Sequence, residues 1–193
     1  MSYAPTSSMD NKVIAITGGA SGIGLATAHL LASRGAKLSL ADVQEAALSE
    51  AALAIKSEHN VEVLTFVLDV RKASQVNDWI SATVSKFGKL DGAANLAGVI
   101  PKSIGVGGIA EQDQAEWDFV IGVNLTGVMH CLRAQMKVIS DGGSIVNAAS
   151  IAGVQGRPNN GAYAASKHGV VGLTRSAAKE IGGKGVRVNS IAP

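Results

Sequence analysis

Paired cysteines, long apolar runs and an excess of charge of one sign are all missing from this sequence, and each absence excludes a class of protein. Its single cysteine, Cys131, cannot form an internal disulfide, so a disulfide-stapled secreted domain is excluded and a reducing compartment is expected. The apolar runs all end well short of the ~20 residues that a membrane-spanning helix needs, so no membrane association is expected. Seventeen basic against fifteen acidic residues leave a charge of +2, too small and too evenly spread for a nucleic-acid-binding face.

The composition nevertheless predicts a folded protein. Hydrophobic residues make up 47% of the chain and charged residues 17%, which excludes intrinsic disorder. Residues 1–11 are polar and lack the basic start and apolar stretch of a secretory signal, so we expect a disordered leader and a cytoplasmic location. Residues 12–193 have the length of one domain.

The four histidines give no sign of a metal site in the sequence. They are scattered over predicted helices, no two of them stand at ligand spacing, and a second cysteine is absent. We therefore expect no bound metal.

Short apolar runs alternate with longer Ala- and Leu-rich stretches, which is typical of a parallel sheet covered by helices. The predicted strands are 13–17, 37–41, 61–68, 92–96, 144–148 and 187–191. The predicted helical regions are 23–33, 44–58, 73–87, 111–140 (broken into two helices) and 162–181.

Right-handed crossovers then favour a doubly wound, Rossmann-type α/β fold with strand order 3-2-1-4-5-6 and helices on both faces of the sheet. In such a fold ligands bind beyond the carboxyl ends of the strands, near strands 1 and 4. The functional motifs are expected to gather at that edge.

A glycine-rich turn connects the first predicted strand to the first helix. Gly18 permits a tight turn, Gly22 lets backbone amides approach a pyrophosphate, and Gly24 allows close packing of helix on strand. The helix N-terminus would then face the anion. The spacing differs from the common G-x-G-x-x-G pattern, and an ordinary turn is the alternative interpretation.

Asp42 ends the second predicted strand, where an acidic side chain can accept hydrogen bonds from the adenosine ribose. Its charge would oppose a 2′-phosphate by roughly 4 kcal/mol at 4 Å and an effective dielectric near 20. NAD is therefore favoured over NADP as the cofactor. The alternative is a solvated aspartate at the start of a helix.

Tyr163 and Lys167 stand four residues apart, hence on one face of a predicted helix, and Ser150 follows the fifth strand. Each of these, and Asn124, could also have a purely local role as a cap, turn or solvated residue. Together with the glycine turn, Asp69-Val70 and Asn95-Leu-Ala-Gly98, their order and spacing resemble the short-chain dehydrogenase/reductase family from residue 12 to residue 193.

The resemblance implies an NAD(H)-dependent oxidoreductase that interconverts a secondary alcohol and a ketone. It makes Tyr163 the acid/base, has Ser150 orient the substrate oxygen and Lys167 assist, and assigns Asn124 a helix kink and a proton-relay water. The implied cofactor-binding residues are Gly18, Ser21, Gly22, Ile23, Gly24, Asp42, Asp69, Val70, Asn95, Ala97, Gly98, Tyr163, Lys167 and Pro193. In the family an Asn or Ala usually follows the residue matched by Asn95, where this chain has Leu96.

Apolar stripes occur on two predicted helices, at Val120, Val123, Val128, Leu132 and Met136, and at Val170, Val171, Leu173 and Ala177. They are interpreted as core by default. The resemblance implies that the same helices pair across a two-fold axis, so a homodimer or homotetramer is also expected.

The sequence stops at Pro193, inside the turn that follows the sixth strand, whereas family members usually continue with a substrate lid and a seventh strand. We therefore expect a dinucleotide-binding catalytic domain that is incomplete at its C-terminal end and lacks the segment that closes over substrate. A catalytically silent nucleotide-binding scaffold or fragment, and an NADPH-dependent biosynthetic ketoreductase, are the alternatives.

Overall fold

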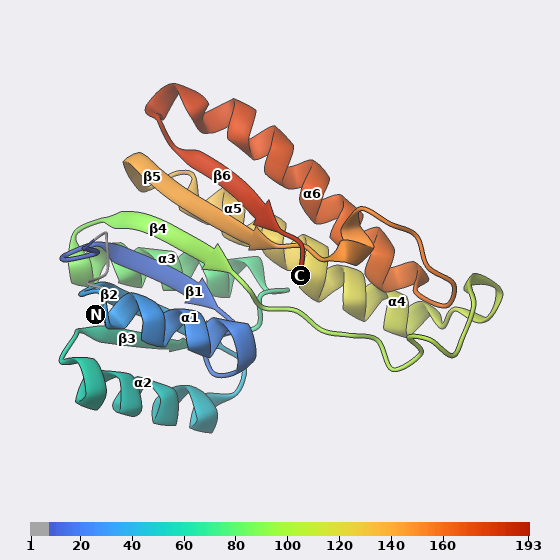
Figure 1. Ribbon diagram of the computed structural model, residues 1–193, viewed down its shortest axis with the longest axis horizontal. Coiled ribbons are helices and arrows are strands. Elements are labelled where there is room, and N and C mark those ends of the chain that lie inside the picture. Colours follow the sequence, from blue (N-terminus) through green and yellow to red (C-terminus); the bar gives the residue numbers. More distant parts are fainter. Residues whose placement is uncertain (1–7) are drawn as a thin grey trace, which may run out of the picture.

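The computed structural model describes residues 8–193 and has one parallel β-sheet at its centre (Figure 1). The strands are β1 (Val13–Thr17), β2 (Lys37–Asp42), β3 (Val63–Val67), β4 (Leu90–Asn95), β5 (Ile139–Ala148) and β6 (Arg187–Ile191). Their order is β3-β2-β1-β4-β5-β6, and every neighbouring pair is parallel. The predicted doubly wound topology is confirmed.

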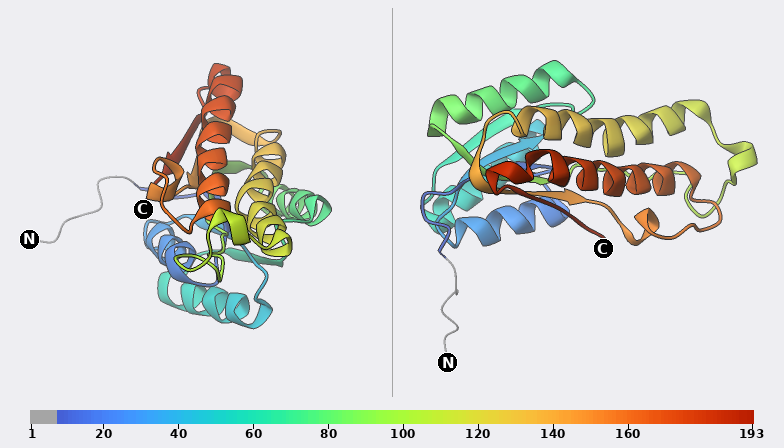
Figure 2. Two further views of the ribbon diagram at one scale, coloured as in Figure 1. Left: turned by 90° about the vertical axis from the view of Figure 1, so that its right-hand side faces the viewer. Right: turned by 90° about the horizontal axis from the view of Figure 1, so that it is seen from above.

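Helices cover both faces of this sheet, as Figure 2 shows. They are α1 (Gly22–Ala32), α2 (Glu45–His59), α3 (Ala73–Phe87), α4 (Gln114–Ile121), α5 (Gly127–Gln135) and α6 (Gly161–Ile181). Apolar residues of α1 and α2 form one core cluster with β1, β2 and β3. Those of α3, α5 and α6 form the second cluster on the opposite face.

The central strands β1 and β2 have almost all of their residues buried, because helices cover both faces of the sheet. All five residues of β1, Val-Ile-Ala-Ile-Thr, are buried, and five of the six residues of β2 are buried as well. A sheet covered on both sides needs no polar face, so its strands lack the alternation of half-exposed strands. At the carboxyl end of β1 the Thr17 hydroxyl accepts the backbone N–H groups of Leu96 and Ala97 at 3.1 and 3.2 Å, which ties the ends of β1 and β4 together.

The predicted helical region 111–140 differs from the structure at its carboxyl end. Helix α5 ends at Gln135, and β5 begins at Ile139, five residues before the predicted strand. The sequence Asp141-Gly142-Gly143 resembles a turn, but here it lies inside β5, where Gly142 has φ +75° and the register with β4 shifts. A strand irregularity of this kind uses the same residues as a loop.

Part of the predicted leader also packs on the domain. Residues 1–7 lie outside the described residues. The Met9 N–H donates to the Arg34 carbonyl at 2.9 Å, and the Met9 side chain packs against the core cluster of α1 and α2. The described end of the leader is therefore attached to the fold.

Most of the apolar residues on the two predicted stripes are buried within the chain itself. Val120, Val128, Leu132, Val170 and Ala177 are each at most 4% exposed. The interpretation of these stripes as core is confirmed for these residues.

Candidate active site

The glycine-rich turn lies between β1 and α1 and has the geometry that its sequence predicts. Gly22 has φ +51°, and a Cβ built there would meet nothing within 4 Å, so the backbone faces open space. A Cβ on Gly24 would lie 2.0 Å from the Gly18 carbonyl oxygen, so the helix reaches its position against the turn only with glycine there. The turn is therefore both tight and open toward solvent.

A cavity of about 440 Å³ adjoins this turn at the carboxyl edge of the sheet, within the size range of small-molecule sites. Ten of the predicted cofactor-binding residues line it: Gly18, Ser21, Gly22, Ile23, Gly24, Asp42, Asp69, Val70, Ala97 and Gly98. These residues come from four different strand ends, which the order β3-β2-β1-β4 places side by side.

Asp42 lies at the end of β2 with its side chain buried against the glycine turn. One carboxylate oxygen accepts the Ala20 N–H at 3.1 Å and the other accepts the Gln44 N–H at 3.0 Å. Asp42 is only 8% exposed and lines the cavity. The alternative of a solvated aspartate is therefore excluded, and a negative charge faces the cavity.

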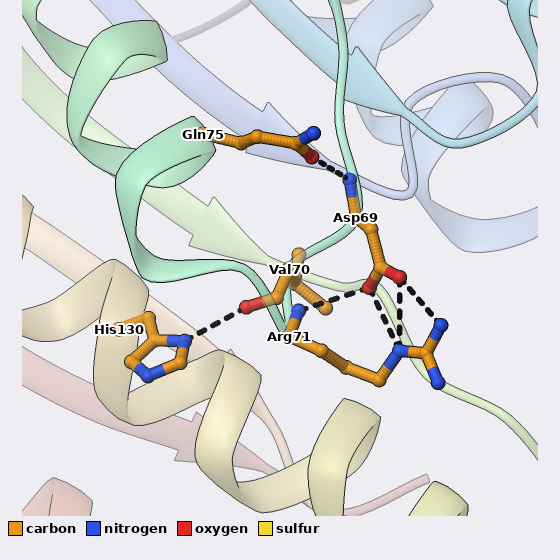
Figure 3. A network of polar contacts seen from close by, with 5 residues as sticks. All are labelled: Asp69, Val70, Arg71, Gln75 and His130. Atoms are coloured by element: carbon orange, nitrogen blue, oxygen red, sulfur yellow. Dashed lines mark hydrogen bonds and ion pairs between the residues drawn. The ribbon is translucent and has the colours of Figure 1, made fainter.

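Asp69 is paired with an arginine that the sequence interpretation had not singled out (Figure 3). The Arg71 Nε and Nη2 donate to Asp69 Oδ2 at 2.9 and 2.5 Å, and the Gln75 side chain accepts the Asp69 N–H at 2.8 Å. The hydrogen bond from Arg71 lowers the pKa of the Asp69 carboxyl below its ordinary value. The Arg71 guanidinium also lies 5.0 Å from the centre of the Phe119 ring, and both residues line the cavity.

Asn95 does not reach the cavity with its side chain. Its amide nitrogen donates to Gln135 at 3.0 Å and to Asn147 at 2.8 Å, and its oxygen accepts from Gln135 at 2.8 Å. Asn147 in turn donates to the Thr174 hydroxyl at 3.0 Å. This buried amide network joins β4, β5, α5 and α6, so Asn95 positions the strand end that carries Ala97 and Gly98.

Tyr163 and Lys167 lie on one face of α6 and are in contact. The Lys167 ammonium lies 5.6 Å from the centre of the Tyr163 ring and donates to the Ala148 carbonyl at the end of β5, at 2.8 Å. Lys167 is 4% exposed, and burial lowers its pKa to about 8. A positive charge is thus held beside the phenol with one strong hydrogen bond.

A π-helical segment, Gly122–Thr126, lies directly between α4 and α5 and contains Asn124. The Asn124 side chain accepts the Val99 N–H at 2.8 Å and donates to the Val99 carbonyl at 2.9 Å. It also donates to the Ser166 hydroxyl on α6 at 3.3 Å. The expected irregularity at Asn124 is present, and such π segments are frequent at functional sites.

Ser150 and Pro193 meet where β5 and β6 end. The Ser150 hydroxyl donates to the Pro193 carbonyl at 3.2 Å and accepts the Ala152 N–H at 3.2 Å. Ser150 is also the N-cap of a short 3₁₀ turn, so the helix-cap role considered for it in the sequence analysis is present as well.

Gly98 lines the cavity and lies close to Asn124 and to Lys167 on α6. A Cβ on Gly98 would lie 3.4 Å from Asn124 Oδ1 and 3.6 Å from Lys167 Nζ. Gly98 thus stands between the cavity and the side chains of Lys167 and Asn124. The residues that line the cavity do not include Asn124, Ser150, Tyr163, Lys167 or Pro193. Sequence reasoning missed several lining residues, among them Val43, Gln44, Arg71, Val99 and Phe119.

The sequence places no two histidines at ligand spacing, but the fold brings one pair of them together. His29 on α1 and His59 on α2 lie with ring nitrogens 3.3 Å apart, together with Glu58. Thirty residues separate the two histidines in the chain, so only the packing of α1 on α2 reveals the pair.

Comparisons with known proteins agree with this geometry. The family model described as short chain dehydrogenase matches residues 12–193. A protein named short-chain dehydrogenase/reductase aba4 from Botryotinia fuckeliana is 62% identical over 183 residues, covering 95% of this chain and 71% of the relative. The crystal structure of levodione reductase matches with a TM-score of 0.90 and 44% identity over 95% of this chain and 71% of that one. The structure of an NAD⁺-bound xylitol dehydrogenase matches with a TM-score of 0.89 and 34% identity, covering 96% and 70%.

This chain belongs to the short-chain dehydrogenase/reductase family, a family of oxidoreductases with a Rossmann-like fold. It spans about 71% of the length of the relative from Botryotinia fuckeliana. None of the helices within residues 8–193 combines the length and the apolar character that a membrane crossing requires.

Proposed function

We propose that this protein is an NAD(H)-dependent oxidoreductase that interconverts a secondary alcohol and a ketone of small size. The observation that carries the proposal is one continuous arrangement. The glycine turn and Asp42 face a cavity, Gly98 in its lining lies next to Lys167 and Asn124, and Tyr163 packs against Lys167.

The residues around the cavity fit a dinucleotide. Gly22 leaves open space where any other residue would place a Cβ, and it stands at the N-terminus of α1, where backbone N–H groups and the helix dipole favour a pyrophosphate. Asp42 offers carboxylate oxygens to the ribose hydroxyls, and the apolar walls include Leu68, Val70 and Val99. Bound NAD supplies the hydride acceptor for an alcohol, and NADH the hydride donor for a ketone.

The chain's own residues would handle the proton. Tyr163 takes the hydroxyl proton of an alcohol or returns it to a ketone oxygen, and the Lys167 ammonium stabilises the phenolate by its charge. Ser150 donates a hydrogen bond to the substrate oxygen by releasing the Pro193 carbonyl that it holds here. Asn124, fixed by Val99 and Ser166, positions the path from Lys167 to solvent.

Asp42 supports NAD over NADP. Its buried carboxylate would stand beside a 2′-phosphate, and like charges at that range oppose each other. The neighbouring cation, Arg71, is held in a bidentate ion pair by Asp69, with Nε donating to Oδ1 and Nη2 donating to Oδ2. The NAD⁺-bound xylitol dehydrogenase of similar fold is consistent with this choice.

Arg71 is also the one observation that favours an NADPH-dependent ketoreductase, because it brings a guanidinium to the cavity that could move to a 2′-phosphate. Calorimetric titration of the chain with NADH and with NADPH tests the choice. Tight binding of NADH and weak binding of NADPH is the expected result; the reverse preference would overturn the proposed cofactor.

Turnover is tested separately, with a panel of small secondary alcohols and ketones and absorbance at the NADH band. Activity that is lost in Tyr163→Phe supports the oxidoreductase, whereas NADH binding with no turnover on any substrate points to a nucleotide-binding scaffold.

We also propose that the protein forms a homodimer or homotetramer. Sedimentation of the same sample measures its oligomeric state.

A further inference from the structure

We propose that His29, Glu58 and His59 form a binding site for a divalent transition metal ion of the zinc class, separate from the cofactor cavity. His29 lies in the last turn of α1, and Glu58 and His59 end α2. The three side chains converge, each offering one ligand atom.

The distances between the three ligand atoms match a tetrahedral ion. His29 Nδ1 lies 3.1 Å from Glu58 Oε2 and 3.3 Å from His59 Nε2, and the third side of the triangle, His59 Nε2 to Glu58 Oε2, measures 3.6 Å. Bonds of about 2.0–2.1 Å from zinc to nitrogen or oxygen, at tetrahedral angles, place ligand atoms about 3.3–3.4 Å apart. The triangle therefore has the size of one face of a zinc coordination tetrahedron.

The donor set selects the class of ion. Two imidazole nitrogens and one carboxylate oxygen suit Zn²⁺, Cu²⁺ or Ni²⁺, whereas Mg²⁺ and Ca²⁺ prefer oxygen ligands. Three protein ligands in a tetrahedral site leave the fourth position for water. The two rings are inclined by 77°, so they approach from different directions and do not stack.

The surroundings give the ion both access and support. The side chain of His59 is 14% exposed and that of His29 is 32% exposed, so the imidazoles are already held by packing, while that of Glu58 is 61% exposed. Glu58 and His59 also line a surface cleft with Asp10 and Arg34, which gives an entry path for the ion.

The site lies at the opposite edge of the sheet from the cofactor cavity. Helices that connect parallel strands run back against the strands, so α1 and α2 end at the amino edge of the sheet, where Figure 1 shows their carboxyl ends side by side. A metal ion there would link α1 to α2, which form one core cluster with β1–β3. Its expected effect is therefore on stability.

A shared proton is the explanation that competes with a metal site, because an imidazole pair and a carboxylate can hold hydrogen bonds without metal.

The test uses the untagged chain, freed of metal with a chelator and titrated with ZnCl₂ by calorimetry and by thermal unfolding. We expect one Zn²⁺ per chain and a Tm that rises by about 5–10 °C at a free Zn²⁺ concentration one hundredfold above Kd. MgCl₂ in place of ZnCl₂ should have no such effect.

The variants His29→Gln, His59→Gln and Glu58→Gln should each weaken Zn²⁺ binding tenfold or more. His168→Gln and Glu50→Gln are matched controls, since both residues are exposed and lie outside the triangle. Replacing zinc by Co²⁺ should give visible absorption typical of tetrahedral cobalt, absent in His59→Gln. The proposal is overturned if the wild type binds no Zn²⁺, or if Glu58→Gln and the histidine variants bind it as the controls do.

Discussion

The Lys167 ammonium is held between the Ala148 carbonyl, 2.8 Å away, and the ring of Tyr163, whose centre lies 5.6 Å away. This arrangement keeps a cation in a site that is 4% exposed, and burial lowers the pKa of Lys167 to about 8. The charge that the proposed chemistry requires is therefore maintained at a cost in folding free energy.

That cost predicts a stabilising substitution. In Lys167→Met the buried charge is absent, and a difference between pKa values of 10.5 unfolded and about 8 folded corresponds to about 3 kcal/mol at pH 7. Loss of the hydrogen bond to Ala148 offsets about 1 kcal/mol of this. We expect Lys167→Met to be about 2 kcal/mol more stable in urea unfolding at pH 7 and to have lost catalytic activity.

The pH dependence of the stability difference between the wild type and Lys167→Met tests whether the buried charge is its cause. Below about pH 8 both folded and unfolded wild type carry the Lys167 proton, so the penalty is complete. Between pH 8 and 10.5 the unfolded state binds more protons, so the wild type gains stability relative to Lys167→Met as the pH rises. A stability difference that stayed constant from pH 7 to pH 10.5 would show that the cost of burying the charge is not its cause.

Tyr163→Phe separates chemistry from cofactor binding. The substitution removes only the phenolic oxygen, and the ring can still pack against Lys167. We expect kcat to fall at least a hundredfold, in keeping with the loss of an acid/base group, with Kd for NADH changed less than threefold. Stopped-flow binding and steady-state rates on one sample measure both quantities, and wild-type kcat in Tyr163→Phe would refute the role.

Much of the fold could be predicted because parallel sheets follow simple rules. Strands such as β1 are buried on both faces and are predominantly apolar, and right-handed crossovers leave few topologies. The errors occurred where residues with turn character lie inside regular structure. Asp141, Gly142 and Gly143 belong to β5, so its length could not be read from local propensity.

The candidate site was predictable where the backbone defines it and less so where tertiary packing defines it. The glycines and Asp42 lie next to one another because consecutive strands end at one edge. The direction of the Asn95 side chain depends on Gln135, 40 residues away in sequence, and that of Asp69 depends on Arg71. A pairing across 40 residues leaves no pattern in one sequence, and the Asp69–Arg71 contact, although local, depends on side-chain directions that residue spacing does not define.

Asp42→Ala should change the choice of cofactor. Removing the carboxylate removes the repulsion of a 2′-phosphate, so the ratio of Kd for NADPH to Kd for NADH should fall at least tenfold. The Ala20 and Gln44 N–H groups lose their acceptor, so we also expect a loss of stability of about 1–2 kcal/mol. Calorimetry with both cofactors measures the ratio. Asp78→Ala, at an exposed position of α3, is the matched control, and an unchanged ratio in Asp42→Ala would contradict the role of Asp42.

The buried amide network predicts a large and specific loss of stability. Gln135 is fully buried and makes two hydrogen bonds with Asn95, accepting at 3.0 Å and donating at 2.8 Å. In Gln135→Leu the Asn95 side-chain oxygen loses the hydrogen bond that Gln135 donates to it. An unpaired buried polar group lowers the free energy of unfolding by about 1–3 kcal/mol. We expect urea unfolding to show a loss within that range, whereas Gln114→Leu, which removes an exposed side-chain hydrogen bond to Asp118, should change stability by less than about 0.5 kcal/mol. Asn95 supports the strand end that carries Gly98, so Gln135→Leu should also weaken NADH binding. Equal stability of Gln135→Leu and Gln114→Leu would show that the network does not hold β4 and α5 together.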